Sequence, residues 1–121
     1  MIRTGWILPL VLFCSCEHSF EHEKYLENLS SDTVFVVNPD FDTIFVAPPI
    51  TQVKFYDFRV LDTKQEREDC RWLGDSLYIF NTNDSLCTKN PKVEANWIST
   101  VEGPEKERIQ KCVFHVDNDD F

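Results

Sequence analysis

Glycine and basic residues are scarce in this 121-residue sequence, and both scarcities exclude classes of function. Only three glycines occur, Gly5, Gly74 and Gly103, which leaves no place for a glycine-rich loop that cradles phosphates. Lysine and arginine number 12 against 21 aspartates and glutamates, for a net charge of −9. A chain this acidic is unsuited to nucleic acid, whose phosphates attract basic side chains.

Catalytic and metal-binding patterns are also missing. No C-x2-C pair is present to ligate zinc, and no serine lies in a G-x-S-x-G nucleophile elbow. After residue 24 the chain holds a single histidine, His115, as a candidate base for a catalytic triad. We predict that the protein is not an enzyme and needs no cofactor. A hydrolase working with two carboxylates stays an alternative, because 21 acids offer many pairs.

The first fifteen residues differ from the rest of the chain. Arg3 and the amino terminus give a positive start, residues 6–14 are uncharged and mostly apolar, and Ser15 is small. This order is typical of a secretory signal peptide. The apolar run is shorter than the roughly 20 residues that span a bilayer. We therefore predict that residues 1–15 are a cleaved signal.

Residues 12–16, Leu-Phe-Cys-Ser-Cys, resemble the lipobox of bacterial lipoproteins, in which a small residue precedes the modified cysteine. Cys16 follows Ser15 and fits this pattern, whereas Cys14 follows Phe13 and does not. The sequence departs from the family at Phe13 and Cys14, where leucine and a small residue are commoner. The resemblance implies cleavage before Cys16 and a diacylglyceryl thioether, with fatty acids such as palmitate, on that cysteine.

The same resemblance, to small envelope lipoproteins like those of Bacteroidota, implies a location. Two or more acyl chains anchor a protein stably, so Cys16 would hold the chain at a cell-envelope membrane without a spanning helix. The resemblance favours the outer membrane over the inner one. Because anionic head groups repel an acidic body, the lipid on Cys16 is the membrane contact we expect. Charge favours a basic envelope protein as the partner.

Export would place the remaining cysteines, Cys70, Cys87 and Cys112, in an oxidising compartment, where disulfides persist. Three thiols allow one bridge and leave one cysteine over. Sequence separation favours Cys70–Cys87, the closest pair, and Cys87–Cys112 is nearly as close. Spacing alone does not decide connectivity.

Short strands and turns fill the body of the chain. Residues 33–37 and 43–46 are rich in β-branched and aromatic residues and flank an Asn-Pro-Asp turn, which predicts a hairpin. A Gly103-Pro104-Glu105 turn predicts a second pair. The other segments predicted as strands are residues 51–61, 76–81, 86–87, 94–102 and 106–117.

Six or seven such strands predict an all-β fold, either a small antiparallel β-sandwich of the immunoglobulin-like type or a small barrel. Residues 16–24 are polar without a clear period and are predicted to form a lipidated tether. The β-domain is expected over residues 25–117. Residues 118–121 are expected to be a flexible tail.

Four tripeptides share the form Asp-Ser/Thr-apolar and lie at predicted strand starts. We favour turn chemistry, in which the aspartate bonds nearby backbone before the strand begins. The alternative is their resemblance to the acceptor motif for O-glycosylation in Bacteroidota. The residues that this resemblance implies as sites are Thr33, Thr43, Ser76 and Ser85.

His18 and His22 lie four residues apart, beside three glutamates. On a helix they would share one face and could hold a metal ion; we favour a solvated tether and predict no metal site. Four large aromatic residues are further candidates, for a sugar- or protein-binding surface, with Trp97 expected in the core. They are Tyr56, Trp72, Tyr78 and Trp97.

These observations predict a non-enzymatic β-domain, displayed on an envelope membrane by a lipid anchor, that acts through binding or as an accessory part of a larger assembly. The alternative is an inhibitor or immunity-type protein that neutralises a basic envelope-attacking enzyme such as a lysozyme. That alternative is an analogy with small acidic lipoproteins of this kind.

Overall fold

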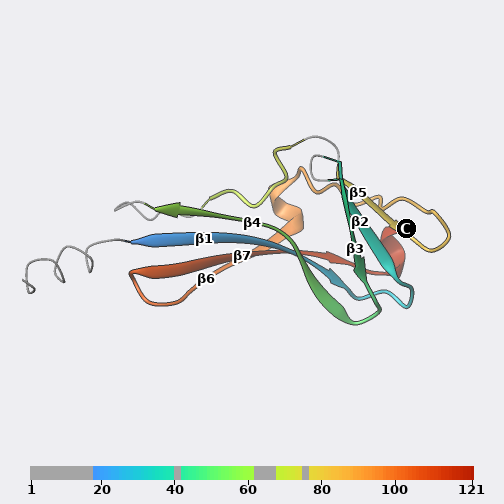
Figure 1. Ribbon diagram of the computed structural model, residues 1–121. Coiled ribbons are helices and arrows are strands. Elements are labelled where there is room, and N and C mark those ends of the chain that lie inside the picture. The colour runs from blue at the N-terminus through green and yellow to red at the C-terminus, as the bar shows by residue number, and fades with distance from the viewer. Residues whose placement is uncertain (1–17, 40–41, 62–67, 75–76) are drawn as a thin grey trace, which may run out of the picture.

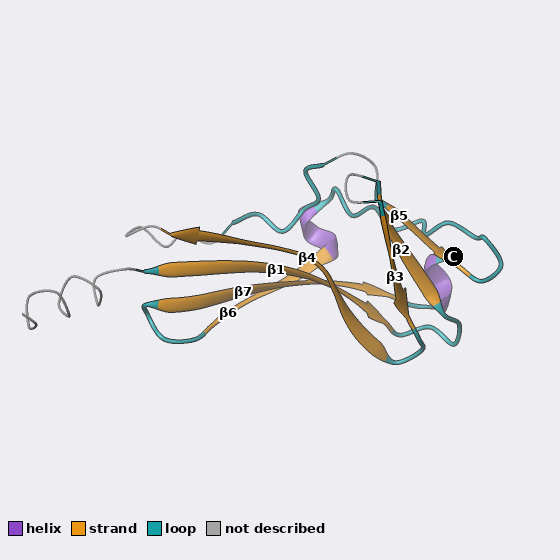
Figure 2. Cartoon of the chain, viewed as in Figure 1, coloured by secondary structure: helices purple, strands orange, loops and turns teal. Residues whose placement is uncertain are grey.

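The computed structural model describes residues 18–39, 42–61, 68–74 and 77–121. Seven strands form two sheets that pack together as a small β-sandwich (Figure 2), so the predicted all-β fold is confirmed. Residues 1–15, predicted as a signal peptide, and Cys16 lie outside the described residues. The strands are β1 (Ser19–Asn28), β2 (Val34–Asn38), β3 (Thr43–Ala47), β4 (Thr51–Leu61), β5 (Tyr78–Asn81), β6 (Trp97–Glu102) and β7 (Glu107–Val116).

The long strands make a four-stranded sheet in the order β4-β1-β7-β6, and the short ones make a three-stranded sheet in the order β3-β2-β5. β1 runs parallel to β7, with Ser19 opposite Glu107 and Asn28 opposite Val116; every other pair is antiparallel, as predicted. The three-stranded sheet lies at the end of the molecule where β1 and β7 finish, and β1 begins at the opposite end (Figure 1).

The two predicted strand pairs are confirmed. β2 and β3 pair antiparallel, from Val34 opposite Ala47 to Asn38 opposite Thr43. β6 and β7 pair around Gly103, whose φ is +95°. A Cβ atom at Gly103 would lie 2.5 Å from the carbonyl oxygen of Glu107, so this turn requires glycine for both its backbone angle and its space.

The predicted tether is wrong over most of its length, because β1 begins at Ser19 and lies in the middle of the four-stranded sheet. Its side chains alternate strictly between a buried and a half-exposed face. The buried face carries Phe20, His22, Lys24, Leu26 and Asn28. Three of these five side chains are polar, which is why the segment lacks the hydrophobic alternation of an ordinary strand.

A buried asparagine joins the two sheets at the end of β1. The side-chain nitrogen of Asn28 donates to the carbonyls of Asp32 at 2.7 Å and Ala47 at 2.8 Å, and its oxygen accepts from Ser30. Because Asn28 is fully buried, these bonds compensate for its desolvation. The apolar core lies between the sheets and includes Leu26, Val34, Val36, Phe55, Ile79, Trp97, Phe114 and Val116.

The C-terminal residues are ordered, so the predicted flexible tail is wrong. Asp117 caps a 3-10 helix over Asn118–Asp120, and the carbonyl of Asp120 accepts from the amide of Thr88 at 2.7 Å. The side-chain oxygen of Asn118 accepts from the amide of Ser31 at 3.0 Å. Phe121 packs against the core.

The disulfide joins Cys70 to Cys112, with their Cα atoms 5.5 Å apart. The predicted pairing of Cys70 with Cys87 is therefore wrong, as is the alternative of Cys87 with Cys112. Cys87 is free and half-buried, and its thiol contacts the carbonyl of Lys89 at 3.6 Å. Burial raises the pKa of the Cys87 thiol, which keeps it protonated near neutral pH.

The connectivity yields a stability prediction. Replacing both Cys70 and Cys112 with alanine should lower the free energy of unfolding by about 2–4 kcal/mol, because the crosslink restricts the unfolded chain. Cys87→Ala is the control and should cost less than about 1 kcal/mol at its half-buried position. Urea unfolding measures both values. A larger loss for Cys87→Ala than for the double variant would contradict the assignment.

Candidate functional site

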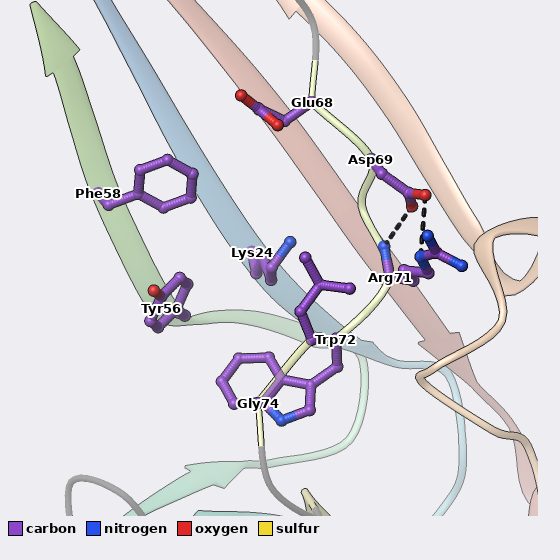
Figure 3. A pocket seen from close by; sticks show the side chains of 9 residues that line it. Lys24, Tyr56, Phe58, Glu68, Asp69, Arg71, Trp72 and Gly74 are labelled. Carbon is purple, nitrogen blue, oxygen red and sulfur yellow. Dashed lines mark hydrogen bonds and ion pairs between the residues drawn. The ribbon is translucent and has the colours of Figure 1, made fainter.

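Residues 68–74 cross the inner face of the four-stranded sheet and roof a pocket (Figure 3). Three attachments hold this crossing segment: the Cys70–Cys112 disulfide, Gln110 and Lys24. The side chain of Gln110 pairs with the backbone of Glu68, accepting from its N–H at 2.9 Å and donating to its carbonyl at 2.7 Å. The ammonium of Lys24 donates to the carbonyl of Cys70 at 2.8 Å.

The far end of the crossing segment is held by the chain before β6. The amide of Trp72 and the indole N–H of Trp97 both donate to the carbonyl of Pro91, at 2.9 and 2.7 Å. The amide of Arg71 donates to a carboxyl oxygen of Glu94 at 3.0 Å. The crossing segment above the pocket is therefore held by bonds at both of its ends.

The pocket has a volume of about 180 Å³ and is mainly apolar. Tyr56 and Phe58 of β4 and Trp72 of the crossing segment form its aromatic walls, and Tyr56 meets Trp72 edge-on, with ring centroids 5.3 Å apart. Lys24 reaches into the middle of the group from β1, and Glu68 lies above it (Figure 3).

Lys24 is a pocket residue that the sequence prediction missed, because it was placed in the tether. Its side chain is nine-tenths buried, and its nitrogen lies 5.4 Å from the centre of the Trp97 ring. Burial lowers the pKa of Lys24, while the negative charges of Glu94, Asp69 and Glu68 oppose that shift. In β1 every second residue faces outward, and three of these outward residues are glutamates. That two-residue period is the sequence signal that could have placed Lys24 on the buried face.

Two carboxyl groups meet beside the pocket. A hydrogen bond from Glu94 lowers the pKa of Asp69, and Asp69 also forms an ion pair with Arg71 at 3.0 Å. Partial desolvation raises the pKa of Glu94, and its bond to Asp69 raises it further. Glycosidases keep their two carboxyl groups about 5–9.5 Å apart, so this directly bonded pair does not have their spacing.

His22 lies between two aromatic rings, with centroid distances of 4.7 Å to Phe20 and 4.6 Å to Phe58. Its Nδ1 is 2.9 Å from the side-chain oxygen of Gln110. Because that oxygen also accepts from the Glu68 amide, it is the acceptor, and Nδ1 carries the hydrogen. Burial lowers the pKa of His22 more than its bond to Gln110 raises it.

The helical metal site considered for His18 and His22 does not form. β1 is extended from Ser19, so four residues span about 13 Å along the chain. His22 is stacked and hydrogen-bonded as described above. Within residues 18–39, 42–61, 68–74 and 77–121, no three metal-ligating side chains gather closely enough to hold an ion.

The four aromatic candidates do not make one surface. Trp72 and Trp97 are buried, which confirms Trp97 in the core, and Tyr56 lines the pocket. Tyr78 is half-exposed on β5, in the other sheet.

The Asp-Ser/Thr-apolar motifs lie at strand ends. The carboxylate of Asp32 accepts from the amide of Thr33 at 2.8 Å, directly before β2. Thr43 is exposed as the first residue of β3, and the amide of Ser85 donates to the side chain of Asn81. Turn chemistry is therefore present at Thr33, and glycosylation stays a prediction for Thr33, Thr43 and Ser85. Ser76 lies outside the described residues.

A second surface is the outward face of the three-stranded sheet, here called the apolar sheet face. Adjacent strands align its side chains: Phe35 lies between Val46 and Phe80, and Val37 lies between Ile44 and Tyr78. Ile44, Val46 and Tyr78 are 62, 50 and 48% exposed. None of these six side chains is charged. Exposed apolar patches of this kind are typical of interaction sites.

Most of the charged residues near the strand ends of the apolar sheet face are acidic; Lys89, which lines a hollow together with Tyr78, is basic. Asp32 precedes β2, Asp42 precedes β3 and Asp84 follows β5. No lysine or arginine occurs in residues 25–53 or 72–88. The outward face of the four-stranded sheet differs, because it carries ion pairs such as Lys54–Glu23 at 3.4 Å. The apolar sheet face therefore has an uncharged centre and a mainly acidic rim.

Comparison of the chain with protein-family models, with curated proteins and with solved structures found no match. In the part of the chain that the structure describes, no helix has the length and apolar character needed to cross a membrane.

His22 makes stability depend on pH. Its pKa is lower in the folded state than the usual 6.5, so the unfolded chain binds more protons and stability falls as pH drops through that value. His22→Phe should make the fall in stability shallower, because the variant lacks the imidazole whose pKa is lowered. The side-chain oxygen of Gln110 keeps a partner in this variant, because it still accepts from the Glu68 amide. His115→Gln, on the opposite sheet face, should retain the fall in stability. Urea unfolding at pH 7.5, 6.5 and 5.5 measures the slopes; equal slopes for wild type and His22→Phe would contradict the prediction.

Proposed function

We propose that this protein is a non-enzymatic binding domain, held at a bacterial envelope membrane by lipid on Cys16, whose apolar sheet face binds a basic partner protein. The observation that carries the proposal is the uncharged, exposed face with its acidic rim. Interface centres are depleted in charge and enriched in aromatic residues, which is the composition of this face.

The acidic rim selects the partner. Opposite charge around an apolar contact speeds encounter and disfavours wrong partners, so the matching surface is apolar with lysines and arginines at its edge. A second copy of this chain would instead bring two acidic rims together. The same reasoning supports a second candidate function, inhibition of a basic envelope-attacking hydrolase. Loss of that hydrolase's activity with excess protein would favour the second candidate.

A lipid anchor on Cys16 would leave the apolar sheet face pointing away from the membrane. Glu17 and His18 separate Cys16 from the first residue of β1, and two residues and their flanking bonds span about 10 Å at most. The amide of Ser19 donates to the carbonyl of Lys106, so the β6–β7 turn lies at the same end. A lipid on Cys16 would hold this end close to the head groups and leave the three-stranded sheet farther from the membrane.

The anchor is tested first. Cys16→Ser should abolish fatty-acid labelling and move the protein out of the membrane fraction. Cys14→Ser is the matched control, because Cys14 follows Phe13, and should retain both labelling and membrane association. Labelling with radioactive palmitate and fractionation measure the two properties. Labelling that persists in Cys16→Ser would overturn the anchor and leave the binding surface to be judged by its own test.

The binding surface is tested by placing a positive charge at one exposed apolar position. Ile44→Lys should weaken binding to a partner, recovered by crosslinking in native membranes, at least tenfold, which corresponds to about 1.4 kcal/mol. The matched control is Ile98→Lys, since Ile98 is 56% exposed on the other sheet and should tolerate the change. Binding should also weaken in high salt. Equal affinities for Ile44→Lys and wild type, or an acidic partner, would contradict the proposal.

A further inference from the structure

The pocket under the crossing segment is lined by an ammonium group that forms no ion pair with any of the described residues. Lys24 is 8% exposed, and among the described residues its nitrogen has one hydrogen-bond acceptor, the carbonyl of Cys70. A lysine ammonium has three donors. Lys24 takes part in none of the ion pairs between described residues.

Burying a charge is costly unless a counter-charge accompanies it. Asp69 lies nearby, but its carboxylate is engaged by Arg71 and by Glu94. Glu68 is exposed and stands at the rim, apart from the Lys24 nitrogen (Figure 3). The ammonium therefore lines the pocket, and no carboxylate of the described residues forms an ion pair with it.

The walls of the pocket define the rest of a ligand. Tyr56, Phe58 and Trp72 present aromatic surface, and Leu73, which is 75% exposed, adds an aliphatic edge. A volume of about 180 Å³ accommodates one large side chain and not a long chain. Apolar pockets with one or two placed polar groups are typical of small-ligand sites.

We propose that this pocket binds a carboxylate next to an apolar or aromatic side chain, as in a free α-amino acid or the C-terminal residue of a peptide. The carboxylate accepts from the Lys24 ammonium in place of water, and the side chain packs between Phe58 and Trp72. Glu68 at the rim is positioned for the amine of a free amino acid or the N–H of a peptide. The site is separate from the apolar sheet face.

The test is calorimetric titration of the full-length protein in detergent with four probes: phenylalanine, N-acetylphenylalanine, glycylphenylalanine and phenylalaninamide. The first three carry the carboxylate and the last does not, so phenylalaninamide should bind at least tenfold more weakly than the best of them. Binding of phenylalanine alone identifies a free amino acid. Binding of the acylated probes identifies a peptide C-terminus.

Lys24→Met removes the ammonium and keeps the apolar stem, and it should weaken binding at least tenfold. Lys89→Met is the matched control. Lys89 also donates to a backbone carbonyl, that of His115 at 2.7 Å, and lies 5.1 Å from an aromatic ring centre, but it is outside this pocket. Its removal should leave binding unchanged.

Leu73→Asp covers the case in which Lys24→Met fails to fold, because Leu73 is exposed and its replacement puts a negative charge at the pocket edge. It should also weaken carboxylate binding at least tenfold. The proposal is overturned if none of the probes binds at millimolar concentration, if phenylalaninamide binds as tightly as the carboxylates, or if both pocket variants retain wild-type affinity.

Discussion

The attachment of residues 68–70 to the middle of the four-stranded sheet is the constraint on which the pocket depends. β1 and β7 are parallel neighbours, so His22 lies opposite Gln110 and Lys24 lies opposite Cys112. Gln110, Lys24 and Cys112 each bond directly to the same short segment. His22 forms a hydrogen bond with the side-chain oxygen of Gln110. Polar side chains are tolerated inside this sheet because the crossing backbone provides their partners.

The outward faces of the two sheets differ in charge. The outward face of the four-stranded sheet carries ion pairs and charged side chains beside exposed apolar residues such as Ile98; Lys54 and Glu23 are paired, and Lys111 lies 4.7 Å from the centre of the Tyr25 ring. That face is suited to water. The apolar sheet face is the proposed partner surface, and it lies at the end of the molecule away from the start of β1 (Figure 1). The proposed anchor at one end and the proposed docking face at the other are consistent with a protein that presents a partner-binding surface from a membrane.

Local sequence signals predicted the parts of the fold that depend on local chemistry. The β2–β3 hairpin follows from its β-branched strands, and the β6–β7 turn follows from a glycine that no other residue can replace there. Long-range features were missed because they leave no local signal. The parallel β1–β7 pair, the Cys70–Cys112 bond and the hydrogen bonds from Ser31 and Thr88 to the C-terminal residues all join positions far apart in the sequence. Tyr56 and Trp72 were recognised as candidates, but Lys24 was not, since its burial depends on a carbonyl 46 residues away.

Hydrogen exchange of the backbone amides, measured before and after reduction of the disulfide, tests the central claim most directly. In the oxidised protein the amides of Glu68 and Trp72 are bonded, to Gln110 and Pro91, and they should exchange slowly. Reduction should release the crossing segment and speed exchange at both positions, while the amides shared by β6 and β7 stay protected as an internal reference. Exchange at Glu68 and Trp72 that is as slow after reduction as before it would contradict the account.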